Sequence, residues 1–160
     1  MYEVTLFPGD GIGPDLVRSM KTLVLDTMKL PISFDSYDVG LTSYEKTGEV
    51  LPEAALNSFR KNHVALKAPI TTPIGRGFRS INVQLRLAFD LYANIRPIQA
   101  INHLPTKFPG TDFVIFRENT EDLYIGEETQ ISPDEAVAVK RITKHASERI
   151  IRQAFEYALA

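Results

Sequence analysis

The sequence has no cysteine, no long apolar run and almost no net charge, and each of these absences excludes a class of function. Without thiols there is no disulfide, no cysteine nucleophile and no zinc–thiolate site. No apolar run approaches the roughly 18 residues that a membrane-spanning helix needs. A net charge of −2 gives no strong field toward nucleic acid or acidic membranes. We therefore expect neither kind of partner, and we predict a reducing, cytoplasmic location.

The composition that remains is that of an ordinary globular chain. Its 160 residues are 44% hydrophobic and 24% charged, which is enough for one domain with a sizeable core. A predicted strand begins one residue after Met1, which predicts that no signal or transit peptide is present.

The first 30 residues have the pattern of a strand, a glycine-rich turn and a helix. Residues 2–7 predict a buried strand, and the apolar stripe after Pro14 predicts a helix over 14–30. This unit opens a parallel α/β sheet. The turn has the spacing G-D-G-I-G, which differs from the dinucleotide motif G-x-G-x-x-G, so the pattern favours a tight structural turn over a phosphate site.

The later elements follow from alternation, turn residues and capping signals. Strands are predicted over 32–39, 64–68, 91–95, 112–117 and 136–142, with 64–68 central in the sheet. Helices are predicted over 52–61, from Ser80, and from Thr143 to the end. Loops are predicted over 40–48, 69–79, 98–111 and 118–126. The loop at 69–79 follows the carboxyl end of a strand, which is where ligands of open α/β sheets bind.

The rest of the chain is organised around residues 80–97, SINVQLRLAFDLYANIRP. Ser80 can cap a helix, and Asn82 and Arg86 share one face of it because they are four residues apart. The strand at 91–95 delivers Arg96 at its end, where Pro97 is expected to stop the ladder. Two guanidiniums beside two neutral hydrogen-bonding side chains suit a small, multiply charged carboxylate. A surface helix with ordinary ion-paired arginines remains the alternative.

Five motifs in one register resemble the isocitrate/isopropylmalate dehydrogenase family. They are GDGIGP (9–14), TTPIGRG (71–77), SINVQLR (80–86), DLYANIRP (90–97) and VIFRENTEDLYIG (114–126). The resemblance implies an α/β chain with the N-terminal part of the family's three-layer fold. Ser80 and Asn82 ahead of Arg86 look like the isocitrate branch. The implied activity is oxidative decarboxylation of isocitrate to 2-oxoglutarate with NAD or NADP and Mg²⁺ or Mn²⁺.

The resemblance also assigns roles to individual residues. Ser80 and Asn82 match positions that hydrogen-bond the substrate's distal carboxylate. Tyr124 matches the tyrosine that helps to protonate the enolate. The remaining matches are the carboxylate-binding Arg86, Arg96 and Arg117, and the cofactor-side Thr71 and Thr72.

The chain departs from the family pattern in length, since family enzymes are about twice as long. The resemblance places the metal-binding aspartates, the catalytic lysine and the adenine-binding loop in a second half, and this sequence shows no metal ligands of its own. It implies that residues 1–97 form the first part of a large domain and 98–160 the beginning of a small one. Residues 126–142 resemble the arm through which family dimers associate, so we expect a homodimer or a partner chain.

Two other patterns could suggest a metal site. The three histidines match no metal-ligand spacing, and the acidic run Glu118, Glu121 and Asp122 favours a solvated turn over a metal site. Three functions therefore remain open: an isocitrate dehydrogenase that is incomplete alone, a non-catalytic regulatory subunit that binds a tricarboxylate, or a fragment without a ligand.

Overall fold

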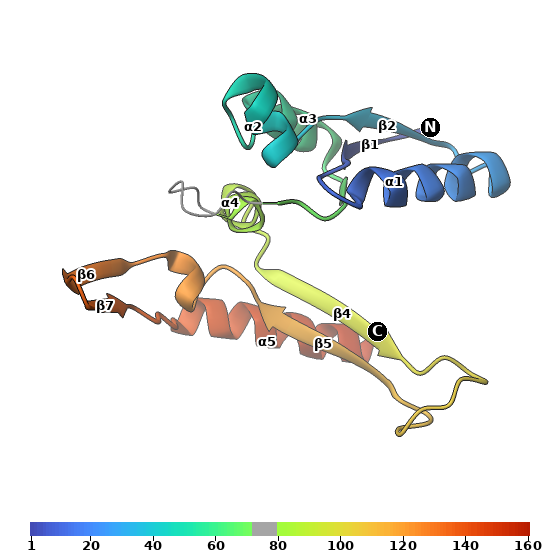
Figure 1. Cartoon of the computed structure of the whole chain (residues 1–160). Coiled ribbons are helices and arrows are strands. Elements are labelled where there is room, and N and C mark those ends of the chain that lie inside the picture. The colour runs from blue at the N-terminus through green and yellow to red at the C-terminus, as the bar shows by residue number, and fades with distance from the viewer. Residues whose placement is uncertain (72–79) are drawn as a thin grey trace. The chain divides into compact units, whose positions relative to one another are not determined.

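The computed structural model describes residues 1–71 and 80–160, so most of the predicted 69–79 loop, including Thr72, lies outside the described residues. The chain forms two compact units, residues 1–81 and 82–160. Each is described by itself (Figure 1). The predicted division into domains at 97/98 stays a prediction.

The first unit is built on a parallel sheet. Strand β1 (Tyr2–Phe7) lies between β2 (Ile32–Ser36) and β3 (Ala65–Lys67) and pairs with both in parallel. Leu6 and Phe7 are fully buried because the central strand is enclosed by its neighbours. The prediction that residues 64–68 form a central strand is wrong among the described residues, since β3 pairs only with β1 and lies at the edge.

Helices flank this sheet. Helix α1 (Gly13–Lys21) continues as one π-helical segment, η1 (Thr22–Thr27), so the helix predicted over 14–30 is present but changes its winding and ends near Met28. Leu16, Val17 and Met20 line a cavity of about 230 Å³ together with residues 66–69 of the β3 edge. The apolar stripe predicted from the sequence is therefore only partly covered within this unit.

Residues 40–48 were predicted as a loop, and this prediction is wrong. Helix α2 (Leu41–Thr47) forms there and ends at Gly48 in the left-handed conformation. Its first amides donate to the carboxylate of Asp10, a residue 31 positions away that no local pattern reveals. Helix α3 (Glu53–Asn62) agrees with the prediction over 52–61.

The second unit is built on an antiparallel ladder. Strand β4 (Ala93–Gln99) pairs with β5 (Asp112–Glu118), and the long helix α5 (Lys144–Leu159) packs on β5, with Phe116 and Tyr157 at 5.2 Å between ring centroids. Thr143 caps α5 as predicted, because its hydroxyl accepts from the Ala146 amide at 3.2 Å. Helix α4 (Ile81–Ala88) precedes the ladder.

The predicted boundaries of the fourth strand are wrong. Arg96 and Pro97 lie inside β4, where Pro97 is opposite Val114, so the proline does not stop the ladder. Among the described residues β4 is paired only with β5, and an edge strand tolerates a proline whose nitrogen faces its open side.

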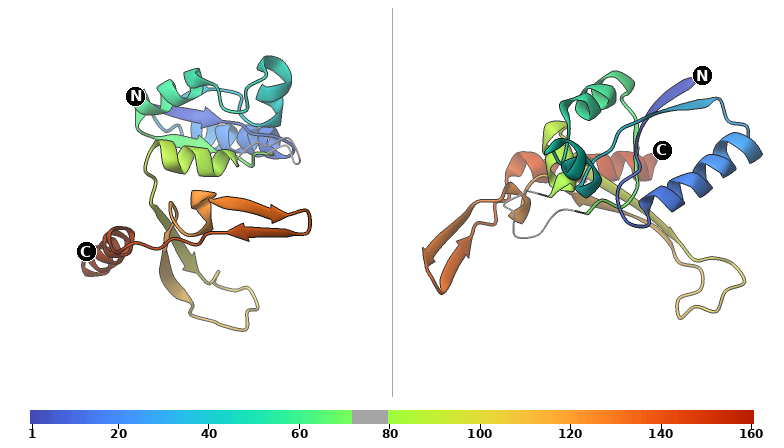
Figure 2. Two further views of the ribbon diagram at one scale, coloured as in Figure 1. Left: turned by 90° about the vertical axis from the view of Figure 1, so that its left-hand side faces the viewer. Right: turned by 45° about the horizontal axis from the view of Figure 1, so that its top comes forward.

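Two shorter elements complete the second unit. A 3-10 turn, η2 (Leu123–Ile125), carries Tyr124. A hairpin of β6 (Glu128–Ser132) and β7 (Glu135–Ala138) extends away from the ladder (Figure 2), with β7 shorter than the strand predicted over 136–142. No helix formed by the described residues combines the length and apolar character needed to cross a membrane.

Candidate functional site

Tyr124 lies between two of the predicted carboxylate-binding arginines. The Arg117 guanidinium donates a hydrogen bond of 2.7 Å to the Tyr124 hydroxyl, and its carbon lies 5.6 Å from the ring centroid. The Arg86 guanidinium carbon lies 5.3 Å from the same ring. Three side chains from α4, the end of β5 and η2 therefore meet at one place. Two guanidiniums beside one aromatic ring present further N–H groups, which can donate hydrogen bonds to a bound anion.

Arg96 shares the face of the ladder that carries Arg117. Arg117 is opposite Asn94 in the register, and Arg96 follows Asn94 by two residues on β4. Side chains two apart on a strand point to the same face, so the two arginines are diagonal neighbours. The Arg96 Nε also donates to the Asn94 side chain at 3.1 Å. Phe116 points to the other face, where α5 lies.

The remaining predicted site residues lie on α4 or before it. Asn82 stands in the first turn of α4, one turn ahead of Arg86, and both are half-buried. Ser80 immediately precedes this helix, and Thr71 belongs to the first unit. The structure thus brings together Arg86, Arg117 and Tyr124, and it aligns Arg96 with Arg117. The convergence of the complete predicted set stays a prediction.

A cavity of about 320 Å³ opens where β5 meets the start of α5. Its lining includes Arg117 and the three acidic residues Glu118, Glu121 and Asp122, beside apolar side chains of α5. Three carboxylates against one guanidinium disfavour an anion there. A carboxylate ligand is therefore expected at the side of Arg117 that faces Tyr124, away from this cavity.

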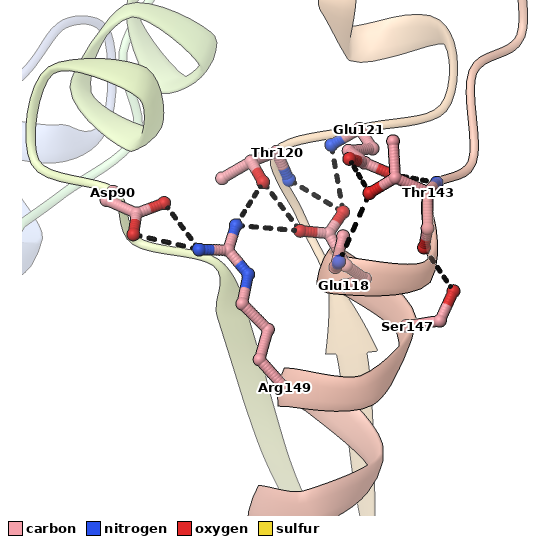
Figure 3. A network of polar contacts seen from close by, with 8 residues as sticks. Asp90, Glu118, Thr120, Glu121, Thr143, Ser147 and Arg149 are labelled. Atoms are coloured by element: carbon pink, nitrogen blue, oxygen red, sulfur yellow. Dashed lines mark hydrogen bonds and ion pairs between the residues drawn. The ribbon is translucent and has the colours of Figure 1, made fainter.

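Polar residues behind the site form a connected network (Figure 3). The Glu118 carboxylate accepts from the Thr120 hydroxyl at 2.6 Å and from the amides of Thr120 and Glu121, both at 2.9 Å. Burial raises the pKa of the Glu118 carboxyl, but these hydrogen bonds outweigh it and hold the pKa below its ordinary value. Arg149 on α5 joins Glu118 to Asp90.

The interpretation of Glu118, Glu121 and Asp122 as a solvated acidic turn is wrong for the two glutamates. Glu118 and Glu121 are half-buried acceptors, and Glu121 receives the Thr143 amide at 2.7 Å and its hydroxyl at 2.6 Å. Within residues 1–71 and 80–160, no three histidine, aspartate or glutamate side chains gather as metal ligands would. The described residues therefore do not by themselves fit the divalent metal that the resemblance implies.

In the first unit, Asp10 fixes the start of the segment that carries Thr71. Its Oδ2 accepts from the Thr71 amide at 2.8 Å and its Oδ1 from the Thr42 amide at 2.9 Å, and the residue is 7% exposed. Burial raises the Asp10 pKa, yet the donors from Thr42, Thr71 and Leu41 lower it overall. Gly40 has φ of +86°, and a Cβ there would overlap Asp10, so glycine is required.

The parallel strand–turn–helix unit and the arginine-rich antiparallel unit define an α/β protein with a candidate carboxylate site. The model of the isocitrate/isopropylmalate dehydrogenase family matches residues 3–160, and the chain belongs to this family. The family named from the sequence motifs and the α/β fold class are thereby confirmed.

Relatives include subunits of NAD isocitrate dehydrogenases, one of them named as regulatory. The chain is 44% identical to NAD isocitrate dehydrogenase subunit 2 of Saccharomyces cerevisiae, over 99% of this chain and 42% of that protein. It is 45% identical to regulatory subunit 1 of the NAD isocitrate dehydrogenase of Arabidopsis thaliana, over 97% of this chain and 41% of that protein.

A solved structure agrees with the fold. The isocitrate dehydrogenase of Methylococcus capsulatus matches with a TM-score of 0.90 and 44% identity, over 99% of this chain and 48% of that one. The chain therefore spans less than half the length of the relatives that it matches.

Proposed function

We propose that this chain supplies the substrate-carboxylate part of an NAD(P)-dependent isocitrate dehydrogenase and does not turn over alone. The observation that carries the proposal is the meeting of Arg86, Arg117 and Tyr124 within one unit. Arginine forks pair bidentately with carboxylates, and several of them around one ligand fix its orientation.

For the roles of the chain's own residues we adopt those that the family resemblance implies. Arg86, Arg96 and Arg117 bind and orient the carboxylates, and Ser80 and Asn82 hydrogen-bond the distal one. Tyr124 holds a proton at Oη, the group that Arg117 already contacts, and delivers it to the substrate carbon after carbon dioxide has left.

The cofactor and metal enter this proposal as partners of a larger assembly. By the family resemblance, Thr71 and Thr72 would contact the nicotinamide side of the cofactor, which when bound would accept the hydride from the substrate. No step is assigned to a metal, because the described residues do not gather its ligands. We propose that these ligands come from a C-terminal half or a partner chain, and that the chain associates through the hairpin within residues 126–142.

A second candidate function is regulatory. The 45% identity to a regulatory subunit favours a chain that binds a tricarboxylate and modulates a catalytic partner. The presence of Tyr124 beside two arginines favours the catalytic part, since ligand binding alone does not need a proton donor.

The test is complementation. Isocitrate-dependent formation of NAD(P)H, with Mg²⁺ or Mn²⁺, is measured for the chain alone and after mixing with a chain that carries the missing half. We expect turnover only in the mixture, and loss of most of it with Tyr124→Phe. Activity that survives Tyr124→Phe unchanged contradicts the catalytic proposal and favours the regulatory one.

A further inference from the structure

We propose that Glu118 is a positioning residue that holds the turn between Arg117 and Tyr124, so that the phenol meets the guanidinium. The importance of this contact for catalysis rests on the proposed function. The hydrogen bonds from which the positioning role is argued are independent of that function. Glu118 follows Arg117 directly, and Tyr124 lies six positions after Glu118.

The Glu118 side chain points away from the candidate ligand side. Successive residues of a strand face opposite sides, so Glu118 shares the face of Phe116, which contacts α5. Its ion pair to Arg149 of α5, at 3.6 Å, agrees with this direction. Glu118 therefore acts on Arg117 and Tyr124 only through the backbone between them.

The carboxylate fixes that backbone at two consecutive amides. Glu118 Oε2 accepts from Thr120 N and Glu121 N, both at 2.9 Å, and the Asn119 and Thr120 side chains of this turn are buried. Hydrogen bonds to an ionised acceptor are the strong ones, and here two of them close on one oxygen. The turn cannot open without releasing both.

The Thr120 hydroxyl connects this turn to α5. It donates to Glu118 Oε1 at 2.6 Å and accepts from Arg149 Nη2 at 2.8 Å. Arg149 also binds both Asp90 oxygens, at 2.9 and 2.8 Å, and lies over the Tyr92 ring at 4.3 Å. Figure 3 shows Arg149 reaching from α5 to the segment after α4 on one side and to Thr120 on the other.

Hydrogen bonds also hold the end of the turn that lies nearer Tyr124. Glu121 binds the cap residue Thr143, and the Asp122 amide donates to the Arg141 carbonyl at 2.8 Å. Tyr124 follows this bridge by two residues. The turn is thus held at one end by Arg149 of α5 and at the other by the segment that leads into α5. We infer that these bonds set the Arg117–Tyr124 contact of 2.7 Å on the opposite face of β5.

The experiment compares variants by NMR of the chain. Nuclear Overhauser effects between Tyr124 ring protons and Arg117 side-chain protons report the contact itself, and amide exchange reports the turn. Glu118→Gln keeps the shape but removes the charge. Thr120→Val removes the linking hydroxyl, and Thr120→Ser retains it. Glu128→Gln, on the exposed strand β6, is the matched control.

We expect the Thr120 and Glu121 amides to exchange about tenfold faster in Glu118→Gln and Thr120→Val, because bonds to a charged acceptor are weakened. The Arg117–Tyr124 signal should weaken in these two and persist in Thr120→Ser and Glu128→Gln. A signal of wild-type intensity in Glu118→Gln and Thr120→Val, despite faster exchange of the turn, overturns the proposal. Equal loss in Thr120→Ser and Thr120→Val overturns the role of the hydroxyl.

A binding measurement separates this inference from the proposed function. The isocitrate dissociation constant should rise about fivefold in Thr120→Val and stay unchanged in Thr120→Ser, a rescue that general destabilisation does not give. Absence of isocitrate binding by the wild-type chain contradicts the proposed function, and the NMR comparison still decides the positioning role. Unchanged affinity in Thr120→Val, where the wild type binds, counts against the inference alone.

Discussion

Replacing Asp10 by asparagine tests how the first unit is held together. Asp10 Oδ1 accepts from the Thr42 amide at 2.9 Å and its hydroxyl at 2.7 Å, and Oδ2 accepts from the amides of Leu41 at 3.1 Å and Thr71 at 2.8 Å. An asparagine must turn its NH₂ group toward one of these two sets. The better choice faces Thr42, whose hydroxyl can rotate to accept, but one amide N–H then loses its acceptor.

The loss of unfolding free energy in Asp10→Asn follows from these hydrogen bonds. One bond to a charged acceptor disappears and the others become neutral, which together costs about 2–4 kcal/mol of unfolding free energy. Urea denaturation followed by circular dichroism measures it, and amide exchange at Leu41 and Thr71 locates it. Asp15→Asn is the matched control, because that side chain is 73% exposed and its ion pair lies on the surface. A loss below about 0.5 kcal/mol in Asp10→Asn, equal to the control, refutes the reasoning.

Three other outcomes are expected. Folding lowers the pKa values of Asp10 and Glu118, so the folded chain binds fewer protons than the unfolded chain. The stabilisation of the fold by these two carboxylates is therefore complete above their unfolded pKa of about 4, and it is lost as pH falls through the folded pKa values. Acid denaturation should show this, with a shallower dependence in Asp10→Asn; an identical pH profile contradicts it. Arg86→Ala should weaken isocitrate binding by about 2 kcal/mol, roughly 30-fold in the dissociation constant, as measured by calorimetry. Gly40→Ala should lower the unfolding midpoint, since its Cβ would overlap Asp10 at a φ of +86°, whereas Gly48→Ala, with open space around the Cβ and a φ of +81°, carries only the backbone strain.

Elements with complete local signals could be predicted from the sequence. Strand β5 has an unbroken apolar run, and α5 begins at Thr143, whose hydroxyl makes the capping bond that the sequence suggests. Helix α2 could not be predicted in this way, because its N-terminal amides are satisfied by Asp10, 31 residues earlier. Local patterns do not encode such partners.

The candidate site shows the same division. Motifs identified Arg86, Arg117 and Tyr124, and the structure brings these three together. The support behind them was missed: Arg149 meets Asp90 from 59 positions away, and no spacing rule connects the two. Glu118 carried a signal, since an acidic residue two positions before a threonine can accept locally, but the pattern equally fits an exposed turn.

The most direct test of the account is calorimetric titration of the chain with isocitrate. Wild-type chain and Arg117→Gln are compared with Arg152→Gln, an exposed arginine on α5, and isopropylmalate serves as the competing ligand. We predict saturable binding of isocitrate in preference to isopropylmalate, with an affinity that falls about tenfold or more in Arg117→Gln and is retained in Arg152→Gln. Equal affinity in the two variants, or binding of neither acid by the wild-type chain, contradicts the claim that this chain holds the substrate's carboxylates.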